Sequence, residues 1–474
     1  MHFLKTDKKA ALPLQDRLAS IAPSLSVLVV IIIFLIVVIV ILLLVVIIVI
    51  VLLIVVLIIV VHNIHLLINT SIVCLKDEKL YFKRNNFDKE ILMLLIQHGL
   101  LYTMETRTPL SADILIKDRK IARIFQTIIP SDEMEVLDAT NLLIFPGFID
   151  AHSHIGISEE KVTGIGDECN ENTSPATPHL RAIDSIHPFD SAFHNALAAG
   201  VTGAMVGPGS SNPVGGQFAF IKTSGRCIDD MVVLAPAAMK IAFGENPMTT
   251  YGMNGNTPST RMGIAGVIRE ELFNVKQYLN NTPPDSTEKN FRMECYRDLF
   301  SKKISLKAHV HRTDDIFTAI RIAKEFDLDL TLDHCTEGHL IAEEIAKSGY
   351  PAIVGPSMSA RSKKEVSQSD FKTAGILKNA GVTIALTTDH PVCRLQYLPL
   401  CAALAVKEGM DEFDALCAIT IDAARICRVE HRLGSIAVGK DADLCLWDGN
   451  PLDVRSSVVK TLINGTVVWE KEKG

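Results

Sequence analysis

Short apolar runs alternate with amphipathic segments along the middle of the chain. From about residue 149 to residue 424, each run is long enough for a buried strand and is flanked by residues with helical spacing. This pattern indicates repeated β-α units around a parallel sheet. The stretch is close to the roughly 250 residues of one eightfold barrel, so the predicted fold class is α/β, with a (β/α)8 TIM-like barrel over 147–431. The clearest predicted strands are 201–206, 305–309, 328–333, 352–354 and 382–386.

The two flanks of this stretch have a different pattern. Residues 93–146 and 432–474 alternate apolar and polar positions, which is typical of strands with one buried face. Hairpin turns are indicated at 117–120 and at 464–465. Because neither flank holds enough strands to be stable alone, we expect both to combine into one small β-sandwich domain.

The front of the chain is dominated by one apolar tract. Every residue from Val27 to Val61 is Val, Ile, Leu or Phe, so no charge, Gly or Pro marks a turn. As a helix, the tract is longer than the roughly 30 Å hydrocarbon thickness of a bilayer, which predicts one tilted transmembrane helix over 25–61. Residues 1–24 would form an N-terminal tail, and residues 62–92 a linker.

A second interpretation is that residues 1–92 do not belong to the functional protein. Met93 opens a segment with strand character, as the first strand of an independent domain would. If the tract is real, the protein is expected to be a single-pass membrane protein; without it, the expected localisation is cytoplasmic. The ten cysteines favour a reducing compartment, because they form no Cys-x-x-Cys pair.

The charge balance excludes one class of partner. The chain has a formal net charge of −7 at pH 7, and residues 93–474 are more acidic than the whole. No Lys/Arg-rich run with interleaved aromatic residues is present, so no nucleic-acid binding is predicted. The expected partner is a small-molecule substrate, and the sequence leaves homo-oligomer assembly open.

Two histidines stand two positions apart at the end of a predicted strand. His152 and His154 follow an apolar run, and side chains at i and i+2 of a strand point the same way. Both imidazoles can therefore reach one metal ion. The competing interpretation is a pair of structural histidines. Further candidate ligands occur in strand order at other apparent strand ends, at Lys240, His309, His334 and Asp389.

These positions resemble the metal-dependent amidohydrolase superfamily, in particular its imidazolonepropionase-like and Xaa-Pro-dipeptidase-like branch. The resemblance covers about residues 93–474. It is carried by Pro146 to His154, by Lys307-Ala308-His309, by His334, by Thr388-Asp389-His390-Pro391 and by the segment from Gly434 to Leu444.

The resemblance implies a site that holds one or two divalent metal ions, with zinc as the expected metal. His152 and His154 would bind the first ion, and His309 and His334 would bind the second. Asp389 would bind the first ion and also handle protons.

For two of the implied metal ligands, the sequence leaves a second residue possible. A carboxylated Lys240 would bridge two ions, since a buried amine with a lowered pKa can form a carbamate. Glu245 could ligate instead, which would leave a site with a single ion. His311 lies two residues after His309 and faces the same side, so either could be the ligand. The family pattern favours His309 and leaves His311 near the substrate, as a second catalytic residue.

The implied reaction is hydrolysis of a carbon–nitrogen bond in an amide, a cyclic amide or a ureide. A divalent metal lowers the pKa of water from 15.7 toward about 7 and polarises a carbonyl group. Asp389 would act as general acid and base, passing a proton to the departing nitrogen. Substrate binding is predicted for Arg261, Arg312, Glu337 and His339, with Arg361 and Tyr251 as further candidates, although the arginines could equally pair with neighbouring acids.

Two other functions stay open at this point. A metal-dependent deaminase would share the His-x-His pair and the terminal aspartate, and would release ammonia. A non-catalytic amidohydrolase-like scaffold protein would have lost metal ligands, whereas every expected ligand position is filled here.

Overall fold

The computed structural model describes residues 93–160, 166–253 and 255–472, all of which belong to one unit, Ile91–Gly474. The predicted tail, transmembrane helix and linker (1–24, 25–61 and 62–92) lie outside the described residues. Within the described ranges, no helix combines the length and the apolar character that crossing a bilayer requires.

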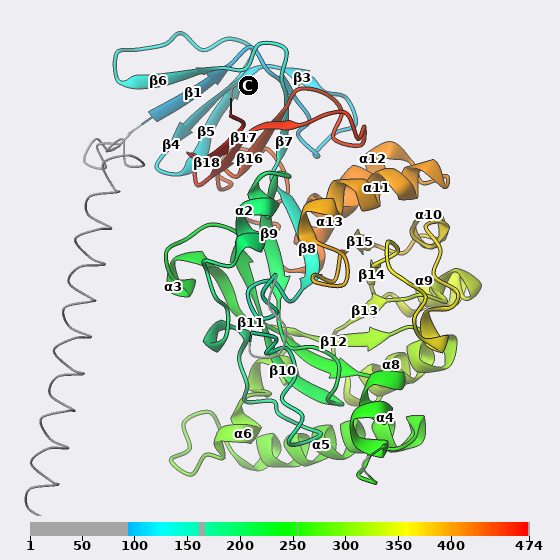
Figure 1. The fold of residues 1–474 in the computed structure, drawn as a ribbon. Helices are drawn as coiled ribbons and strands as arrows, with labels where there is room; N and C mark the ends of the chain where they lie inside the picture. The colour runs from blue at the N-terminus through cyan, green and yellow to red at the C-terminus, as the bar shows by residue number, and fades with distance from the viewer. Residues whose placement is uncertain (1–92, 161–165, 254, 473–474) are drawn as a thin grey trace, which may run out of the picture. The chain divides into compact units, whose positions relative to one another are not determined.

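An eight-stranded sheet forms a nearly closed barrel (Figure 1). Most of the predicted strands are confirmed, and 201–206 and 352–354 are strands at the predicted bounds. Every residue of the first barrel strand is buried, as expected for a strand covered on both faces. In sheet order the strands are β15 (Ile384–Leu386), β14 (Ala352–Val354), β13 (Leu330–His334), β12 (Ser305–Val310), β11 (Val232–Ala242), β10 (Val214–Lys222), β9 (Val201–Val206) and β8 (Phe148–Ser153).

Strand β10 departs from the predicted (β/α)8 repeat. It runs antiparallel to both β9 and β11, whereas the other neighbouring strands of this sheet pair in parallel. Only residues 207–213 connect β9 to β10, and a parallel crossover needs a dozen or more residues. The short connection accounts for the reversed strand, so the barrel is a mixed sheet.

The helices lie mainly on the outside of this barrel (Figure 1). Helix α8 (Thr313–Phe326) buries Ile316, Ile320 and Ala323 on one face. The other α-helices of the described residues are α2 (Ser191–Leu197), α3 (Ile228–Met231), α4 (Glu245–Gly252), α5 (Arg261–Asn281), α6 (Phe291–Glu294), α7 (Arg297–Phe300), α9 (Ala342–Ser348), α10 (Lys372–Asn379), α11 (Leu398–Lys407), α12 (Glu412–Ala418) and α13 (Ile421–Ile426). Short 3-10 helices are η1 (Ala182–Asp184), η2 (Gly338–Leu340), η3 (Lys364–Val366) and η4 (Leu395–Tyr397).

The two flanks of the barrel form two further sheets. One has the strand order β5-β4-β1-β6, and the other has the order β18-β17-β16-β7-β2-β3. Their strands are β1 (Met93–Gln97), β2 (Leu100–Leu101), β3 (Leu110–Ser111), β4 (Asp113–Lys117), β5 (Lys120–Phe125), β6 (Met134–Asp138), β7 (Leu143–Pro146), β16 (Leu444–Trp447), β17 (Val458–Ile463) and β18 (Thr466–Glu470).

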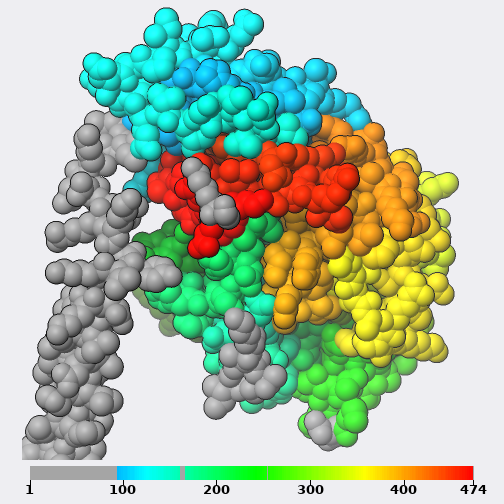
Figure 2. Space-filling view, turned by 45° about the horizontal axis from the view of Figure 1, so that its top comes forward, coloured from blue at the N-terminus to red at the C-terminus, as the bar shows by residue number. Residues whose placement is uncertain are grey.

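The second of these sheets draws strands from both flanks, because β7 pairs antiparallel with β16. Figure 2 shows the C-terminal residues, in red, next to the N-terminal flank strands, in blue and cyan. Both sheets contribute to one apolar core, to which Ile114 and Leu444 belong. The assignment of 93–146 and 432–474 to a separate composite domain stays a prediction.

Both predicted hairpin turns adopt a left-handed backbone. Asp118 and Arg119 join β4 to β5 with φ values of 53° and 66°. Asn464 and Gly465 join β17 to β18 with φ values of 53° and 74°. Two successive positive φ values are the signature of the tight turn that suits the twist of a hairpin.

Candidate metal centre

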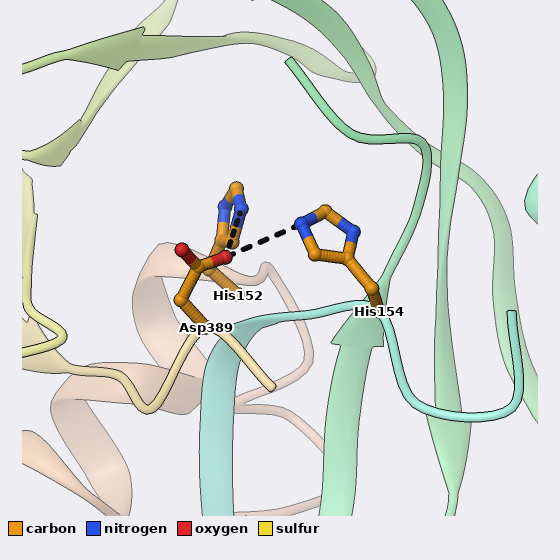
Figure 3. Close-up of side chains that lie close together, drawn as sticks. All are labelled: His152, His154 and Asp389. Carbon is orange, nitrogen blue, oxygen red and sulfur yellow. Dashed lines mark ion pairs between the residues drawn. The ribbon is translucent and has the colours of Figure 1, made fainter. Parts of the chain in front are cut away.

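His152, His154 and Asp389 converge at the ends of the first and last barrel strands (Figure 3). Asp389 Oδ1 lies 3.5 Å from Nε2 of His152 and 3.2 Å from Nε2 of His154. Ligand atoms of the three residues all lie within 4.8 Å of one another. Two imidazoles and one carboxylate form a donor set that divalent metal ions bind, so these residues fit a metal centre.

In both His152 and His154, the ring nitrogen that faces away from Asp389, Nδ1, is hydrogen-bonded to an oxygen acceptor. His152 Nδ1 lies 2.9 Å from Asp333 Oδ2, and His154 Nδ1 lies 2.7 Å from the carbonyl oxygen of Gly207. Because these oxygens accept, Nδ1 carries the proton and the lone pair of each ring is on Nε2. Nε2 of His152 is buried and has no hydrogen-bond partner, as expected of an atom that awaits a cation.

Asp333 is a buried carboxylate that the sequence analysis missed. Its Oδ1 accepts from the Thr331 hydroxyl at 3.0 Å and lies 3.3 Å from Nζ of the buried Lys307. Adjacent residues of a regular strand face opposite sides. Asp333 directly precedes the candidate ligand His334, so the sequence pattern predicted that Asp333 would point away from the site. The backbone of His334 has φ 74°, which breaks that alternation, and the His334 ring centroid lies 5.0 Å from that of His152.

Left-handed backbone occurs at two of the predicted ligands. His334 has φ 74° and Asp389 has φ 51°, conformations that cost non-glycine residues about 1–3 kcal/mol each. His334 is held by its Nδ1, which donates to the Gly355 carbonyl at 2.7 Å. The Asp389 backbone N–H donates to the Thr387 hydroxyl at 3.0 Å. Strain that is buttressed in this way is typical of functional sites.

Burial fixes the charge states in the site. Burial lowers the pKa of His152, His309 and His311 well below its usual range, and neighbouring positive charges act in the same direction. These rings are therefore neutral at pH 7, the form that binds metal. For Asp389, burial alone would raise the pKa, but the electrostatic influence of the neighbouring His334, His154 and Lys240 outweighs burial and lowers the pKa to about 2.

A second group of three potential ligands lies in the same barrel. His309 lies near the end of β12, and His311 directly follows that strand. Glu365 belongs to η3. Ligand atoms of the three lie within 4.8 Å of one another, and burial raises the pKa of Glu365. Sequence reasoning missed Glu365, because it stands in a loop well past the end of β14 and carries no strand-spacing signal.

Lys240 and Glu245, the two alternatives for a bridging ligand, have different surroundings. Lys240 is fully buried in β11, and its Nζ has no hydrogen-bond partner. Burial lowers the pKa of Lys240 to about 8. The Glu245 carboxylate instead accepts from the backbone N–H of Glu365 at 3.0 Å and belongs to neither group of potential ligands.

A pocket of about 430 Å³ opens over both groups. Its walls include His154, His309, His311 and Asp389. The turn after β9 contributes Gly209 and Ser210 to the wall. Other polar residues in the wall are Ser158, Asp167, Asn170, Asn246, Thr336, Ser359, Ser362, Lys363 and Ser369.

The residues predicted to bind substrate are not among those that line this pocket. Arg261 lies 3.0 Å from Asp315, and Arg312 lies 3.0 Å from Asp314, so both guanidinium groups pair with nearby acids. The remaining candidates bind neighbouring groups: Glu337 accepts from the backbone of Thr313, His339 bonds to the Thr373 hydroxyl, Arg361 donates to the carbonyl of Ser369, and Tyr251 donates to the carbonyl of Ser174.

Comparisons by sequence and by structure both find amidohydrolases. A model of the amidohydrolase family matches residues 352–469. The crystal structure of an amidohydrolase from Thermotoga maritima is 41% identical with a TM-score of 0.77, and the match covers 80% of this chain and 100% of that one. A prolidase crystallised with N-methylphosphonate-L-proline shares the fold, at 16% identity and a TM-score of 0.51, over 80% of this chain and 100% of that chain.

A curated relative matches over a smaller share of its own length. The amidohydrolase tasK of Hapsidospora irregularis is 25% identical over 406 residues, which cover 80% of this chain and 40% of that protein. The identity and complete coverage of the Thermotoga maritima protein, with the barrel and the converging histidines and aspartate, establish the family. The chain belongs to the amidohydrolase family, hydrolases that act on carbon–nitrogen bonds.

Proposed function

We propose that this protein is a metal-dependent hydrolase that cleaves a carbon–nitrogen bond in a small-molecule amide, cyclic amide or ureide. The observation that carries the proposal is the Asp389 carboxylate facing the Nε2 atoms of His152 and His154, at 3.5 Å and 3.2 Å. Zinc is the proposed ion, because imidazole and carboxylate ligands suit it and because zinc sites that catalyse hydrolysis keep three protein ligands.

A divalent cation held by these residues would polarise the substrate carbonyl and lower the pKa of water toward about 7. Asp389 supplies the proton transfer. Since its pKa is lowered to about 2, its carboxylate is ionised at neutral pH and can accept a proton. The same group can then deliver that proton to the departing nitrogen, which is a poor leaving group without it.

Lys240 is proposed to carry a carbamate that adds an oxygen ligand to the centre. Its amine is fully buried and unpartnered, and a pKa of about 8 leaves part of it neutral near physiological pH. Only a neutral amine reacts with carbon dioxide. The resulting negative charge would be compensated by the cation, whereas a protonated lysine at this depth has no counter-ion within hydrogen-bond distance.

Lys363 is proposed to bind an anionic group of the substrate. It lines the pocket, its ammonium contacts the Asn246 side chain, and among the described residues it forms no ion pair with a carboxylate. A lysine in the wall of a substrate pocket suits a carboxylate on the substrate. We therefore favour acylated amino acids and related acids over neutral amides.

The test combines metal analysis with product analysis. Protein purified without added metal is assayed for bound ions, and then for hydrolysis of N-acyl amino acids, dipeptides and cyclic ureides. We expect bound zinc and release of a carboxylic acid from at least one of these classes. Release of free ammonia by exchange of an amino group would instead identify a deaminase, and protein that binds no divalent ion at any concentration would contradict the proposal.

A further inference from the structure

Two charged residues in the pocket wall do not belong to either group of potential metal ligands. Besides the histidines and Asp389, the described residues that line the pocket include one further acid, Asp167, and one further base, Lys363. Asp167 bonds to Ser158 and Lys363 contacts Asn246, but neither has a partner of opposite charge among the residues that the structure describes. Charged groups of this kind can recognise opposite charges on a ligand.

Asp167 is held beside the segment that carries His154. Its Oδ1 accepts from the Ser158 hydroxyl at 2.5 Å, and the backbone N–H of Ser158 donates to the His154 carbonyl at 2.9 Å. Burial raises the pKa of the Cys169 thiol to about 12, so the thiol is protonated at neutral pH. Because the Ser158 proton is used for Asp167, the thiol donates to Ser158 Oγ at 3.0 Å. This chain of hydrogen bonds fixes the carboxylate next to His154.

Lys363 is held beside a different pair of histidines. Its ammonium contacts the Asn246 side chain, whose amide donates to the Ser210 hydroxyl at 2.7 Å. Burial lowers the pKa of His309 and of His311, and the charges of neighbouring histidines and of Lys363 act in the same direction. The positive charge of Lys363 is therefore close to the histidines at the end of β12.

The strands β8 and β12 stand opposite each other in the barrel. In the sheet order, β9, β10 and β11 separate them in one direction, and β13, β14 and β15 separate them in the other. His154 directly follows β8, and His309 lies near the end of β12. Asp167 and Lys363 therefore lie toward opposite sides of the pocket, with the candidate metal ligands between them.

We propose that Asp167 binds an ammonium group of the substrate, so that the substrate is a zwitterion with its two charges on opposite sides of the scissile carbon–nitrogen bond. This inference rests on the proposed function, in which Lys363 binds a carboxylate and the amide lies at the metal centre. An amide that spans the pocket then places one charged end at Asp167 and the other at Lys363. An acylated amine would instead leave the Asp167 carboxylate facing a neutral group, without a cation.

Asp167→Asn tests this role on a panel of dipeptides, each in an unblocked, an N-acetylated and a C-terminally amidated form. The asparagine oxygen can still accept from the Ser158 hydroxyl, so the variant removes the charge and keeps the local hydrogen bond. The wild type should have a lower KM for the unblocked form than for the N-acetylated form. Asp167→Asn should raise KM about tenfold for the unblocked and amidated forms, with little change in kcat or in the KM of the N-acetylated form.

Lys363→Met is the reciprocal variant, which should raise KM for the unblocked and N-acetylated forms only. Glu168→Gln is the matched control, because Glu168 is an exposed acid next to Asp167 that does not line the pocket. An equal rise in KM for all three forms in Asp167→Asn would indicate a structural role and overturn the assignment. A wild type that hydrolyses N-acyl amino acids but no unblocked dipeptide would also overturn it, while leaving the proposed function intact. A protein that hydrolyses no amide or ureide would overturn both.

Discussion

Thr388 donates two hydrogen bonds to one oxygen of Asp150, from its backbone N–H at 2.9 Å and from its hydroxyl at 2.5 Å. Asp150 belongs to β8 and Thr388 follows β15, so this contact joins the first and last strands of the barrel sheet. Asp150 lies two residues before His152, and Thr388 directly precedes Asp389. The same contact therefore closes the barrel and sets the distance between an imidazole and the carboxylate that faces it.

Asp150→Asn should disrupt this closure. The second carboxylate oxygen accepts from the Thr387 hydroxyl at 2.7 Å and from the His152 backbone at 3.1 Å, so every neighbour of Asp150 is a donor. The NH2 group of asparagine would face one of these donors, and that donor would lose its acceptor. We expect the free energy of unfolding to fall by about 2–4 kcal/mol and metal affinity to fall with it, as measured by denaturant unfolding and metal titration.

Asp113→Asn provides the control for this prediction. Asp113 is another buried aspartate, which accepts from Gln97 and from two backbone N–H groups, but it lies in β4, away from the barrel. Its replacement should lower stability without changing metal affinity. Equal loss of metal in both variants would show that the Asp150 contact has no specific role in the site.

The sequence predicted those parts of the fold and site that depend on local spacing. Strand β9 and the pair His152 and His154 follow from patterns of alternate residues within one segment. The reversal of β10 was missed, because nothing in a short apolar run tells the direction in which the strand will pair. Its only sequence signal is the short connection at 207–213.

The missed site residues depend on long-range contacts. Asp333 and the adjacent His334 both lie beside His152, which the regular alternation of a strand would not allow, and the backbone of His334 is left-handed. Glu365 reaches His309 through a loop whose path is set by Glu245. Such positions have no periodicity that a sequence can display, and they become visible only when the barrel brings separate segments together.

Asp389→Asn should reduce kcat by about 10²–10⁴-fold while most of the metal stays bound, because an amide can coordinate weakly through oxygen but cannot accept and return a proton. The double variant His152→Ala/His154→Ala should instead lose the metal of this site. Metal content and steady-state kinetics on the same preparations separate the two effects. Wild-type activity in either variant would rule out the assigned roles.

Lys240 should give a carbamate signal in carbon-13 NMR when the protein is equilibrated with labelled carbon dioxide. The pKa of Lys240 is lowered to about 8 by burial, so the neutral, reactive amine becomes more abundant as the pH rises through that value. At constant dissolved carbon dioxide, the signal should therefore increase between about pH 7 and about pH 9. It should be absent in Lys240→Met and present in Lys363→Met, and a signal that survives in Lys240→Met must come from another amine.

Lys363→Met should weaken the binding of anionic substrates. Removing the ammonium group from the pocket wall is expected to raise KM about tenfold for substrates with a carboxylate, equivalent to about 1.4 kcal/mol, with little change in kcat. Neutral analogues should be unaffected. Lys364→Met is the matched control, because Lys364 is exposed and does not line the pocket. An equal rise in KM for neutral and anionic substrates would contradict a role in charge recognition.

Asp441 should make the protein sensitive to acid. Burial alone would raise the pKa of this carboxyl, but hydrogen bonds from Arg432, Lys120 and Lys222 hold it well below its usual range. Lys222, at the end of β10, lies 2.9 Å from Asp441, so the interaction ties the barrel to the C-terminal flank. Because the folded-state pKa is lowered, the stabilisation is complete above the unfolded pKa of about 4 and is lost as the pH falls through the folded value.

Acid unfolding of Asp441→Asn measures this contribution. The variant should be less stable than the wild type at pH 7, and its stability should fall less steeply below about pH 4, because the titrating group has been removed. Asp132→Asn, which removes an exposed carboxylate from the N-terminal flank, controls for the change in net charge. If Asp441→Asn and the wild type lose stability with the same slope in acid, the Asp441 interactions are not what makes the fold sensitive to pH.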